Sequence, residues 1–210
     1  MMGGCVTAGL GLRRLAKETA FFVSLVIAVP LIVLAWCEKR LTSSETVFTA
    51  CAQLLALVPG FAGRWLRGAY YFGTLDRCSW EIHIGFGSLF THRGAELGPR
   101  VSMGAYCVIG HARIGEGVMM GSRVSIPSGK RQHLDDEGRL ARVTRFERIS
   151  IGPGSWVGEG AIILAHIGER CIVSAGAVVS KDMPSACLIV GNPARAIREL
   201  ETDVPRAHLE

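Results

Sequence analysis

The sequence lacks any closely spaced pair of cysteines, although it contains seven cysteines in 210 residues. They are scattered along the chain at Cys5, Cys37, Cys51, Cys78, Cys107, Cys171 and Cys187. A disulfide framework usually has an even number of cysteines, and a zinc ribbon needs CxxC pairs, so the sequence disfavours both. The simplest interpretation is that these residues are reduced thiols, most of them buried.

Net charge is almost absent from the second half of the chain. Residues 81–210 carry 15 Lys or Arg against 14 Asp or Glu, a net charge of +1, so no nucleic-acid footprint is expected there. Residues 1–80 carry eight Lys or Arg against four Asp or Glu, a net charge of +4. This basic excess flanks an apolar stretch, where the surface of an anionic membrane would attract it.

Residues 20–37, AFFVSLVIAVPLIVLAWC, contain no charged side chain at all. Such a run is close to the minimum length of helix that crosses ~30 Å of hydrocarbon. No A-x-A-like cleavage site follows it, so a retained membrane anchor is favoured over a cleaved signal peptide. Pro30 would kink this helix, which is tolerated in membrane spans.

A second apolar stretch covers residues 47–63, but a glutamine, a proline and two glycines interrupt it. Three interpretations remain open for this region. It is a second span, a re-entrant hairpin, or an interfacial helix that places Trp65, Tyr70 and Tyr71 at the level of the lipid headgroups.

From residue 82 onward the 3.6-residue periodicity of an amphipathic helix is missing. A unit of mostly six residues repeats instead: a small or β-branched residue, any residue, and a large apolar residue, often followed by glycine. Residues i and i+2 of an extended segment face the same side. Fourteen such pairs occur, at Ile82/Ile84, Ser88/Phe90, Ala95/Leu97, Val101/Met103, Cys107/Ile109, Ala112/Ile114, Val118/Met120, Val124/Ile126, Ile149/Ile151, Ser155/Val157, Ala161/Ile163, Ala165/Ile167, Cys171/Val173 and Ala177/Val179.

This repeat predicts a β-solenoid. Each unit would form one straight side, and the glycines would allow the backbone conformation that the corner needs. Three sides would close one triangular coil, so fourteen pairs predict between four and five coils whose neighbours bury a continuous core. An all-β solenoid is therefore preferred over a β-sandwich.

The repeat resembles the hexapeptide-repeat acyltransferase family. The ending VSAGAVVSKDMPSACLIVGNPARAIREL, residues 173–200, is similar to the family's C-terminal signature, in which K-D-x-P leads to G-N-P-A-[KR] and a short helix. The resemblance covers about residues 80–200. It implies a left-handed parallel β-helix, an exception to the usual right-handed crossover. It also implies a homotrimer with active sites in the clefts between subunits, acetyl-CoA or another acyl-CoA as co-substrate, and no metal.

Three regions are expected on this basis. Residues 1–80 form a membrane-anchoring helical region, and residues 81–190 form the left-handed β-helix acyltransferase domain. Residues 191–210 form a C-terminal tail and helix. The rhythm breaks for residues 127–148 and then resumes, so this segment is an excursion loop and not a domain boundary. An insertion in a solenoid lies on one face, which is often the binding face.

His133 is the only histidine of the excursion, in the segment SGKRQHLDDEG. In sugar O-acetyltransferases of the family a protruding loop carries the catalytic histidine, so the resemblance assigns His133 as the general base. It would take a proton from the acceptor hydroxyl as that oxygen attacks the thioester carbon, a task suited to a pKa near neutrality. The alternative is a solvated loop histidine. Asp135 and Asp136 either orient the imidazole or form a polar turn.

Other histidines compete for this role. His83, His92 and His111 are expected to face outward from the coils, and His166 lies in a step shortened to four residues. A zinc site shared between subunits would require converging histidines, and the close H-x4-H spacing typical of such sites is absent.

For coenzyme A, the resemblance implies contacts on the last coils. Ala175 matches a position whose backbone meets the pantetheine arm. Lys181 and Arg195 match basic positions near the nucleotide phosphates, where charge-assisted hydrogen bonds are strong. An ordinary solvent-facing lysine in a turn is an equal alternative for Lys181.

The sequence therefore predicts a membrane-anchored, acyl-CoA-dependent O-acyltransferase, an acetyltransferase that modifies a saccharide or lipid-linked saccharide in exopolysaccharide biosynthesis. Since the acyl donor is cytoplasmic, the β-helix is expected at the cytoplasmic membrane, facing the cytoplasm. Two alternatives remain open. One is an acyltransferase for a small amine or hydroxy amino acid, and the other is a non-catalytic trimeric scaffold of a membrane synthase complex.

Overall fold

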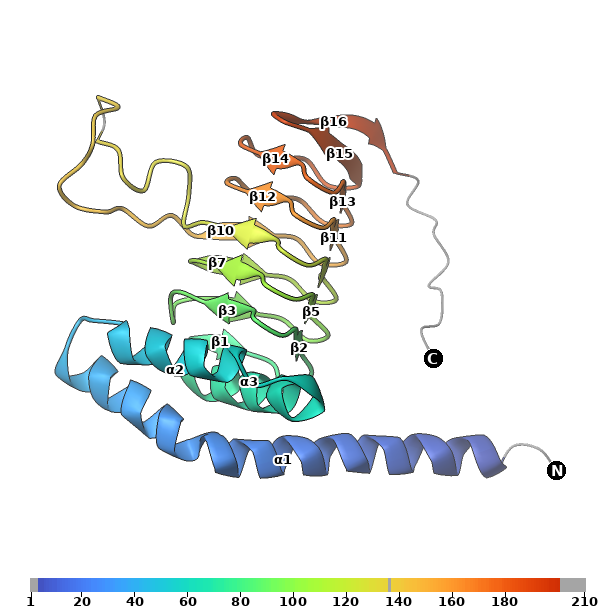
Figure 1. Cartoon of the computed structure of the whole chain (residues 1–210). Coiled ribbons are helices and arrows are strands. Elements are labelled where there is room, and N and C mark those ends of the chain that lie inside the picture. The colour runs from blue at the N-terminus through green and yellow to red at the C-terminus, as the bar shows by residue number, and fades with distance from the viewer. Residues whose placement is uncertain (1–3, 136, 201–210) are drawn as a thin grey trace.

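The structure of the chain, a computed structural model, describes residues 4–135 and 137–200. A layer of helices closes one end of a β-solenoid (Figure 1). In the described residues this layer consists of α1 (Gly4–Leu41), α2 (Thr46–Ala56) and α3 (Gly60–Thr74). Helices α2 and α3 pack against the first coil, and α1 packs beneath them and runs across the end of the solenoid (Figure 1).

The described strands form three sheets, one for each side of the solenoid. Sheet A contains β1 (Arg77–Cys78), β4 (Glu96–Leu97), β7 (Ala112–Ile114) and β10 (Ile149–Ile151). Sheet B contains β2 (His83–Ile84), β5 (Ser102–Met103), β8 (Met119–Met120), β11 (Trp156–Val157), β13 (Ile172–Val173), β15 (Cys187–Gly191) and β16 (Ala194–Glu199). Sheet C contains β3 (Leu89–Phe90), β6 (Val108–Ile109), β9 (Ser125–Ile126), β12 (Ile162–Ile163) and β14 (Val178–Val179).

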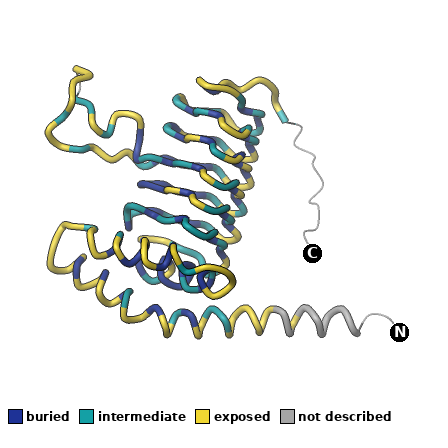
Figure 2. Tube along the Cα trace, in the orientation of Figure 1, coloured by how far each residue is buried: buried dark blue, intermediate teal, exposed yellow. Residues whose placement is uncertain are grey.

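Equivalent residues of successive coils lie in register, as the sequence pairs predict. In sheet B, Ile84 aligns with Met103, and Met103 aligns with Met120. All three side chains are buried, and the same holds along the inner faces of sheets A and C (Figure 2). Apolar area is therefore removed from water between every pair of coils, which is the main force that holds a solenoid together. The predicted fold class, a left-handed parallel β-helix with an N-terminal helical segment, is confirmed.

The number of coils was underestimated. Six parallel strands of sheet B, from β2 to β15, mark six turns in the described residues, where the fourteen pairs predicted four to five. The count missed β1, where the charged Asp76 takes the small position of the pair, and Cys187/Ile189, which follows the last counted pair by ten residues. In the shortened step, Ile167 joins sheet A only through isolated bridges to Ile151 and Met183.

The repeat glycines serve a different purpose from the one predicted. Gly98, Gly115 and Gly121 do not have a positive φ. Other residues of the coils, including Gly154 and Gly176, adopt the positive φ instead. Instead, the next coil passes directly over the repeat glycines. A Cβ atom on Gly121 would lie 2.8 Å from the backbone nitrogen of Glu159. These glycines are needed because they allow close approach of one coil to the next.

The expected C-terminal helix is wrong for the described residues. After Gly191 the chain turns back, and β16 pairs antiparallel with β15, with Val190 opposite Arg195. The last parallel strand of a solenoid would otherwise leave a row of unpaired backbone groups, and β16 covers this edge. Residues 201–210, the rest of the predicted tail, lie outside the described residues.

The second apolar stretch forms two short helices that pack on the solenoid. Tyr70 and Tyr71 do not lie at a membrane surface, because both are fully buried. The hydroxyl of Tyr70 donates to the carbonyl of Phe48 at 2.9 Å, and that of Tyr71 accepts from the amide of Phe90 at 3.1 Å. The interpretation of these two tyrosines as headgroup anchors is therefore corrected. The helices and the coils share one core, so the domain boundary near residue 80 stays a prediction.

Buried serines connect neighbouring coils. The hydroxyl of Ser155 donates to the carbonyl of Gly168 at 2.9 Å and accepts from the amide of Cys171 at 3.0 Å. Ser88 makes the same bridge, to the carbonyl of Gly104 and the amide of Cys107. The small position of the repeat is thus also a place where a polar side chain can satisfy backbone groups of the next coil.

Replacement of Ser155 by alanine should therefore destabilise the fold. It leaves the amide of Cys171 buried without this acceptor, which costs about 1–3 kcal/mol. At this chain length the thermal midpoint should fall by about 2–4 °C per kcal/mol, as measured by circular dichroism. Ser174→Ala, at a half-buried serine whose hydroxyl makes none of the described hydrogen bonds, is the control and should change the midpoint little. Equal midpoints for both variants would contradict the bridging role.

Candidate active site

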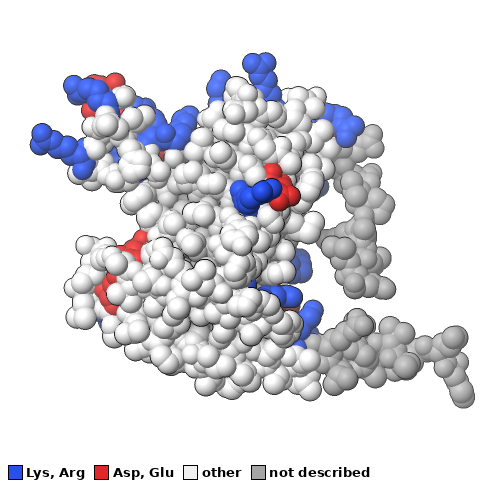
Figure 3. All heavy atoms as spheres, in the orientation of Figure 1, with Lys and Arg blue, Asp and Glu red and all other residues white. Residues whose placement is uncertain are grey.

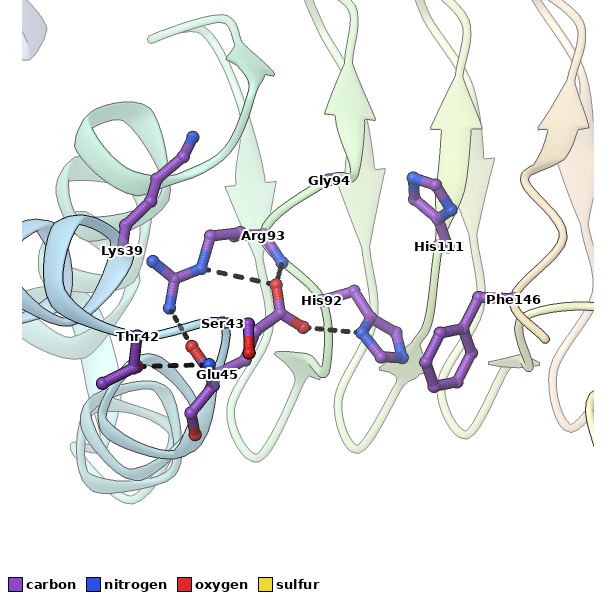
Figure 4. Close-up of a pocket in the computed structure, with 10 residues that line it drawn as sticks. Lys39, Thr42, Ser43, Glu45, His92, Arg93, Gly94, His111 and Phe146 are labelled. Atoms are coloured by element: carbon purple, nitrogen blue, oxygen red, sulfur yellow. Dashed lines mark hydrogen bonds and ion pairs between the residues drawn. The ribbon is translucent and has the colours of Figure 1, made fainter. Parts of the chain in front are cut away.

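A hollow of about 560 Å³ opens where the connection between α1 and α2 meets one corner of the solenoid (Figure 4). Lys39 and residues 42–45 line one side of the hollow. The corner between β3 and β4 supplies His92, Arg93 and Gly94, and the next corner supplies His111. Phe146, near the end of the excursion, completes the wall. The stacking of the coils brings these corners together although 19 positions separate the two histidines in the sequence.

His92 and Glu45 form a histidine–carboxylate pair in this hollow. The Nδ1–H of His92 donates to Oε2 of Glu45 at 2.7 Å. A carboxylate on Nδ1 fixes the tautomer in which Nε2 carries a free lone pair, the form that a general base requires. Nε2 points away from Glu45 (Figure 4). The ring of Phe146 lies against the imidazole, with 4.2 Å between the ring centroids.

Arg93 holds Glu45 in place and is 92% buried, with a relative exposure of 8%. Its amide donates to Oε1 of Glu45 at 3.0 Å, and its Nη2 donates to Oε2 of Glu38 at 2.6 Å. Its Nη1 donates to the carbonyl of Ala35 at 3.0 Å. Burial by itself would raise the pKa of Glu45, but the hydrogen bonds from His92 and from the amide of Arg93 hold the pKa below its usual value. Glu45 is therefore a carboxylate at neutral pH.

Glu38 has a second partner at the start of α2. Its two carboxylate oxygens accept from the amides of Val47 at 2.7 Å and Phe48 at 3.0 Å. Free amides at the beginning of a helix need such acceptors and favour negative charge. Burial opposes ionisation, but these hydrogen bonds and Arg93 together lower the pKa of Glu38. One buried arginine thus connects the end of α1, the start of α2 and the corner that carries His92.

His111 is unsuited to act as a base in this arrangement. Nε and Nη2 of Arg148 donate to its Nε2 at 3.1 and 3.0 Å, so the lone pair of Nε2 is occupied. Burial lowers the pKa of His111, and the positive charge of Arg148 lowers it further. Arg148 is itself held by Glu96, with 2.6 Å between Nη1 and Oε1. His111 is thus a neutral acceptor that orients the guanidinium.

The excursion leaves and returns at the same corner. The amide of Glu147 donates to the carbonyl of Ser128 at 3.0 Å, and Nζ of Lys130 reaches the carbonyl of Ser180 at 3.4 Å. Between these points the segment projects from the solenoid as a long arm (Figure 1). His133 lies exposed on this arm, away from the residues that line the hollow, and its carbonyl accepts from the amide of Ala141 at 2.9 Å.

Asp135 forms a polar turn and does not contact His133 in the described contacts. Its Oδ1 accepts from the amides of Glu137 at 3.1 Å and Arg139 at 2.8 Å. Hydrogen bonds from Arg139, the amide foremost, lower the pKa of Asp135. Asp136, the other candidate to orient His133, lies outside the described residues.

The three residues expected to bind coenzyme A do not meet within one chain. Ala175 lies exposed at the corner between sheets B and C, whereas Lys181 lies at the corner between sheets C and A. Arg195 is exposed on β16. They surround the same end of the solenoid, so a ligand that touches all three would have to follow its outer surface.

The surroundings of two further histidines give no support for a role as base. Nδ1 of His166 accepts from the amide of Ser150 at 3.0 Å, so this side chain closes the shortened corner. Burial lowers the pKa of His83, and Arg64 and Arg67 lower it further. Across residues 4–135 and 137–200, no group of three or more histidine, cysteine or acidic residues is arranged to hold a metal ion.

Sequence reasoning missed Glu45, Arg93 and Phe146. Glu45 lies 47 positions before its partner His92, and Phe146 lies 54 positions after His92. One signal was available: Glu45 is the only acidic residue between positions 39 and 75. An acid at the start of an apolar helix is, however, common for reasons of helix capping alone, so the signal would not have identified a site.

Comparisons with known proteins support this class of fold. No family model matches the chain. A Schizosaccharomyces pombe protein, named provisionally as an acetyltransferase, is 38% identical over 92 residues, which are 43% of this chain and 44% of that protein. Serine acetyltransferase 2 of Arabidopsis thaliana is 32% identical over 117 residues, 53% of this chain and 35% of that protein. The chain thus spans less than half the length of either relative.

Three solved structures named as acetyltransferases have the same architecture. A maltose O-acetyltransferase from Clostridium difficile superimposes with a TM-score of 0.66 at 23% identity, covering 75% of this chain and 87% of that one. A hexapeptide-repeat acetyltransferase from Vibrio cholerae gives 0.57 at 21%, covering 73% and 89%. A galactoside acetyltransferase in complex with coenzyme A gives 0.52 at 16%, covering 75% and 81%. The chain has the fold of the hexapeptide-repeat acyltransferases, and the resemblance read from its repeat is confirmed.

The buried Glu38–Arg93 pair predicts a specific dependence of stability on pH. The pKa of Glu38 is lowered in the folded state from its usual value of 4.5. The ionised carboxylate therefore adds to the free energy of unfolding at pH values above 4.5. The contribution is lost as the pH falls through the lower, folded-state pKa. Glu38→Gln should cost roughly 3 kcal/mol of unfolding free energy at pH 7.

Denaturant titrations of the wild type and Glu38→Gln from pH 7 to pH 3 measure this effect. The difference in unfolding free energy between the two proteins should become smaller as the pH falls below 4.5, the usual pKa of a glutamate. Glu137→Gln, on the exposed part of the excursion, is the matched control and should follow the wild type throughout. A difference that stays constant with pH would show that the charge of Glu38 is unimportant.

Proposed function

We propose that the protein is an acyl-CoA-dependent acyltransferase, an acetyltransferase that acts on a hydroxyl of a saccharide. The observation that carries the proposal is the sequence similarity of the coils to acetyltransferases, on a solenoid that has the same architecture. The maltose and galactoside acetyltransferases among the structural neighbours favour a sugar as acceptor. A role in exopolysaccharide biosynthesis, at the cytoplasmic membrane with the solenoid in the cytoplasm, is part of the same proposal.

The donor in this proposal is acetyl-CoA. The galactoside acetyltransferase complex with coenzyme A supports the ligand class. Lys181 and Arg195 would meet the phosphates of the nucleotide, and the backbone of Ala175 would meet the pantetheine arm. Because these residues lie on different surfaces of one chain, a cleft against a neighbouring subunit would help to enclose the cofactor.

In the reaction, a neutral imidazole removes the proton of the acceptor hydroxyl while its oxygen attacks the thioester carbonyl carbon. The C–S bond then breaks, and the imidazolium returns the proton to the departing thiolate of coenzyme A. We propose His133 as this base, since it lies on the arm that projects from the solenoid, and a neighbouring subunit of the proposed trimer would complete the site around it. His92 is a second candidate, because its hydrogen bond to Glu45 already fixes the basic tautomer.

Alanine variants of three histidines distinguish these candidates. His133→Ala should leave the fold intact, because the arm lies outside the coils, and should lower kcat for acetyl transfer by about 10²–10⁴-fold. The KM for acetyl-CoA should change little. His111→Ala should retain much more activity, since its Nε2 is occupied by Arg148.

The same assay, which follows release of the coenzyme A thiol, includes His92→Ala and Glu45→Gln. Normal turnover of His133→Ala together with an inactive His92→Ala would transfer the role of base to His92. In that case Glu45→Gln should also lower kcat and alter its pH profile. Normal turnover in all three histidine variants would exclude both candidates.

We also propose a homotrimer, because a single chain does not enclose the residues assigned to coenzyme A. The mass of the protein in mild detergent, measured by light scattering with correction for the detergent, should equal three chains of 22.6 kDa. A mass of one chain would remove the intersubunit site from the proposal.

Two alternatives remain. The similarity to a serine acetyltransferase favours an acyltransferase for a small amine or hydroxy amino acid. The second alternative is a non-catalytic trimeric scaffold of a membrane synthase complex. Steady-state turnover of acetyl-CoA by the purified protein with sugar and amino acid acceptors separates the three, since a scaffold releases no thiol with any acceptor.

A further inference from the structure

We propose that α1 lies in the plane of the membrane and enters only one leaflet, so that the helical layer is a monotopic docking surface for an anionic lipid bilayer. This inference rests on the proposed membrane attachment but not on acyl transfer. Among the described residues, the segment Arg14–Leu41 of α1 is the one helix long and apolar enough to cross a membrane. The contacts along this helix nevertheless favour a different placement.

One face of α1 is committed to the protein along its whole apolar length. Buried residues recur every three to four positions, at Ser24, Ala28, Ile32, Ala35 and Glu38. This is the stripe of a helix that packs on one side only. The opposite face is exposed and apolar. It comprises Phe22, Val23, Val26, Ile27, Val29, Val33 and Leu34.

The packed face of α1 contacts α3 and the first coil of the solenoid. Phe21 contacts Phe72 and Trp80, with centroid distances of 5.3 and 5.9 Å, so the middle of α1 touches the first coil. Nε1 of Trp36 donates to the carbonyl of Gly73 at 2.7 Å. If residues 20–37 crossed the bilayer, these contacts would carry the edge of the solenoid into hydrocarbon, where unsatisfied backbone groups cost several kcal/mol each.

The orientation of α1 in the fold is compatible with a position in the plane of the membrane. Helix α1 runs across the end of the solenoid, and its exposed side faces away from the coils (Figures 1 and 2). On the face shown in Figure 3, few charged side chains lie over the helical layer. A helix of this kind lies in the interface with its apolar face buried ~5–10 Å below the headgroups.

The charges around this surface favour anionic lipids as the occupant. Residues 1–80 have a net charge of +4. A second hollow of about 650 Å³ lies between α1 and the first strands of sheet B. Its charged and titratable lining residues are Lys17, Arg64, Arg100, His83 and one acid, Glu81. The cationic groups of Lys17 and Arg64 in this hollow suit the phosphate of a lipid headgroup.

The four lysines of the chain provide the test without any substitution. Lys17 precedes the apolar run and Lys39 follows it, while Lys130 and Lys181 lie on the solenoid side. Sealed membrane vesicles are treated with a membrane-impermeant amine reagent, and modified lysines are identified by mass spectrometry. In vesicles that expose Lys130 and Lys181, an in-plane helix exposes Lys17 and Lys39 as well.

A spanning helix gives a different pattern. Lys39 is modified together with the two solenoid lysines, but Lys17 is modified only after the vesicles are permeabilised. That result overturns the proposal while leaving membrane attachment intact. Wild-type protein that remains in the soluble fraction as a larger oligomer overturns both, since a second copy then covers the apolar face.

Charge variants test the outward face. The pair Val26→Glu and Ile27→Glu, at positions with relative exposures of 57% and 60%, should lower partition into vesicles of phosphatidylglycerol by about tenfold or more. The matched control is Leu140→Glu with Val143→Glu, exposed on the excursion, which should bind as the wild type does. Binding to phosphatidylcholine vesicles alone should be weaker. Equal binding of both double variants would contradict the outward face as the docking surface.

Discussion

The stacking of one coil directly on the next is the constraint on which the rest of the structure depends. Because each coil repeats the path of the one below, corners that are far apart in the sequence form a single column. The corner between sheets C and A contains His92, then His111, then the excursion, then His166 and Asp182. Any polar side chain at this corner therefore meets polar groups from the neighbouring coils. A catalytic surface can form there without any special local structure.

Arg93 is where this column meets the helices. A buried guanidinium is costly unless its donors and charge are matched, and breaking such a pair is strongly destabilising. The two terminal nitrogens of Arg93 meet these needs with the carboxylate of Glu38 and the carbonyls of Ala35 and Ser44, while its Nε lies 3.3 Å from Oε1 of Glu45 as an ion pair without a hydrogen bond. The same contacts fix the connection between α1 and α2 against the solenoid. The position of Glu45, and through it the tautomer of His92, thus depends on how α1 is seated.

The sequence predicted the solenoid well because its information is local and repeated. Each pair such as Val101/Met103 states which residues face inward, and fourteen agreeing pairs leave little freedom. The two ends of the solenoid were harder to predict. The strand Arg77–Cys78 lacks the pair, and the strand Ala194–Glu199 forms because the edge of β15 needs a partner. That need arises from the tertiary structure and is not visible in the residues of the tail itself.

The sequence could identify the excursion, because a break in the repeat is also local information, but it could not identify the hollow. An interrupted rhythm marks the excursion, so residues 127–148 and His133 could be selected from sequence. The contact between His92 and Glu45 joins two regions with different periodicities, and nothing in either region specifies the other. Only the packing of the helical layer against the first coil brings them within 2.7 Å. The interpretation of Tyr70 and Tyr71 as headgroup anchors was wrong for a related reason. Aromatic residues are as common in a buried core as at a membrane interface, so the sequence alone does not distinguish the two.

The hollow and the docking surface have consequences for each other. Lys39 and residues 42–45 line the hollow, and they continue directly from α1. If α1 lies in one leaflet, the hollow opens close to the headgroups, where diffusion of an acceptor is confined to the membrane plane. A saccharide carried on a lipid would then reach His92 or His133 without leaving the surface, whereas a free sugar would gain nothing from this location. If both proposals hold, a lipid-linked acceptor should therefore react faster than the free sugar in vesicles, and a comparison of the acetylation rates of the two forms of one sugar, in vesicles and in detergent, tests this expectation. A preference for the lipid-linked form that persists unchanged in detergent would mean that the enzyme recognises the lipid itself, and not the membrane surface that presents it.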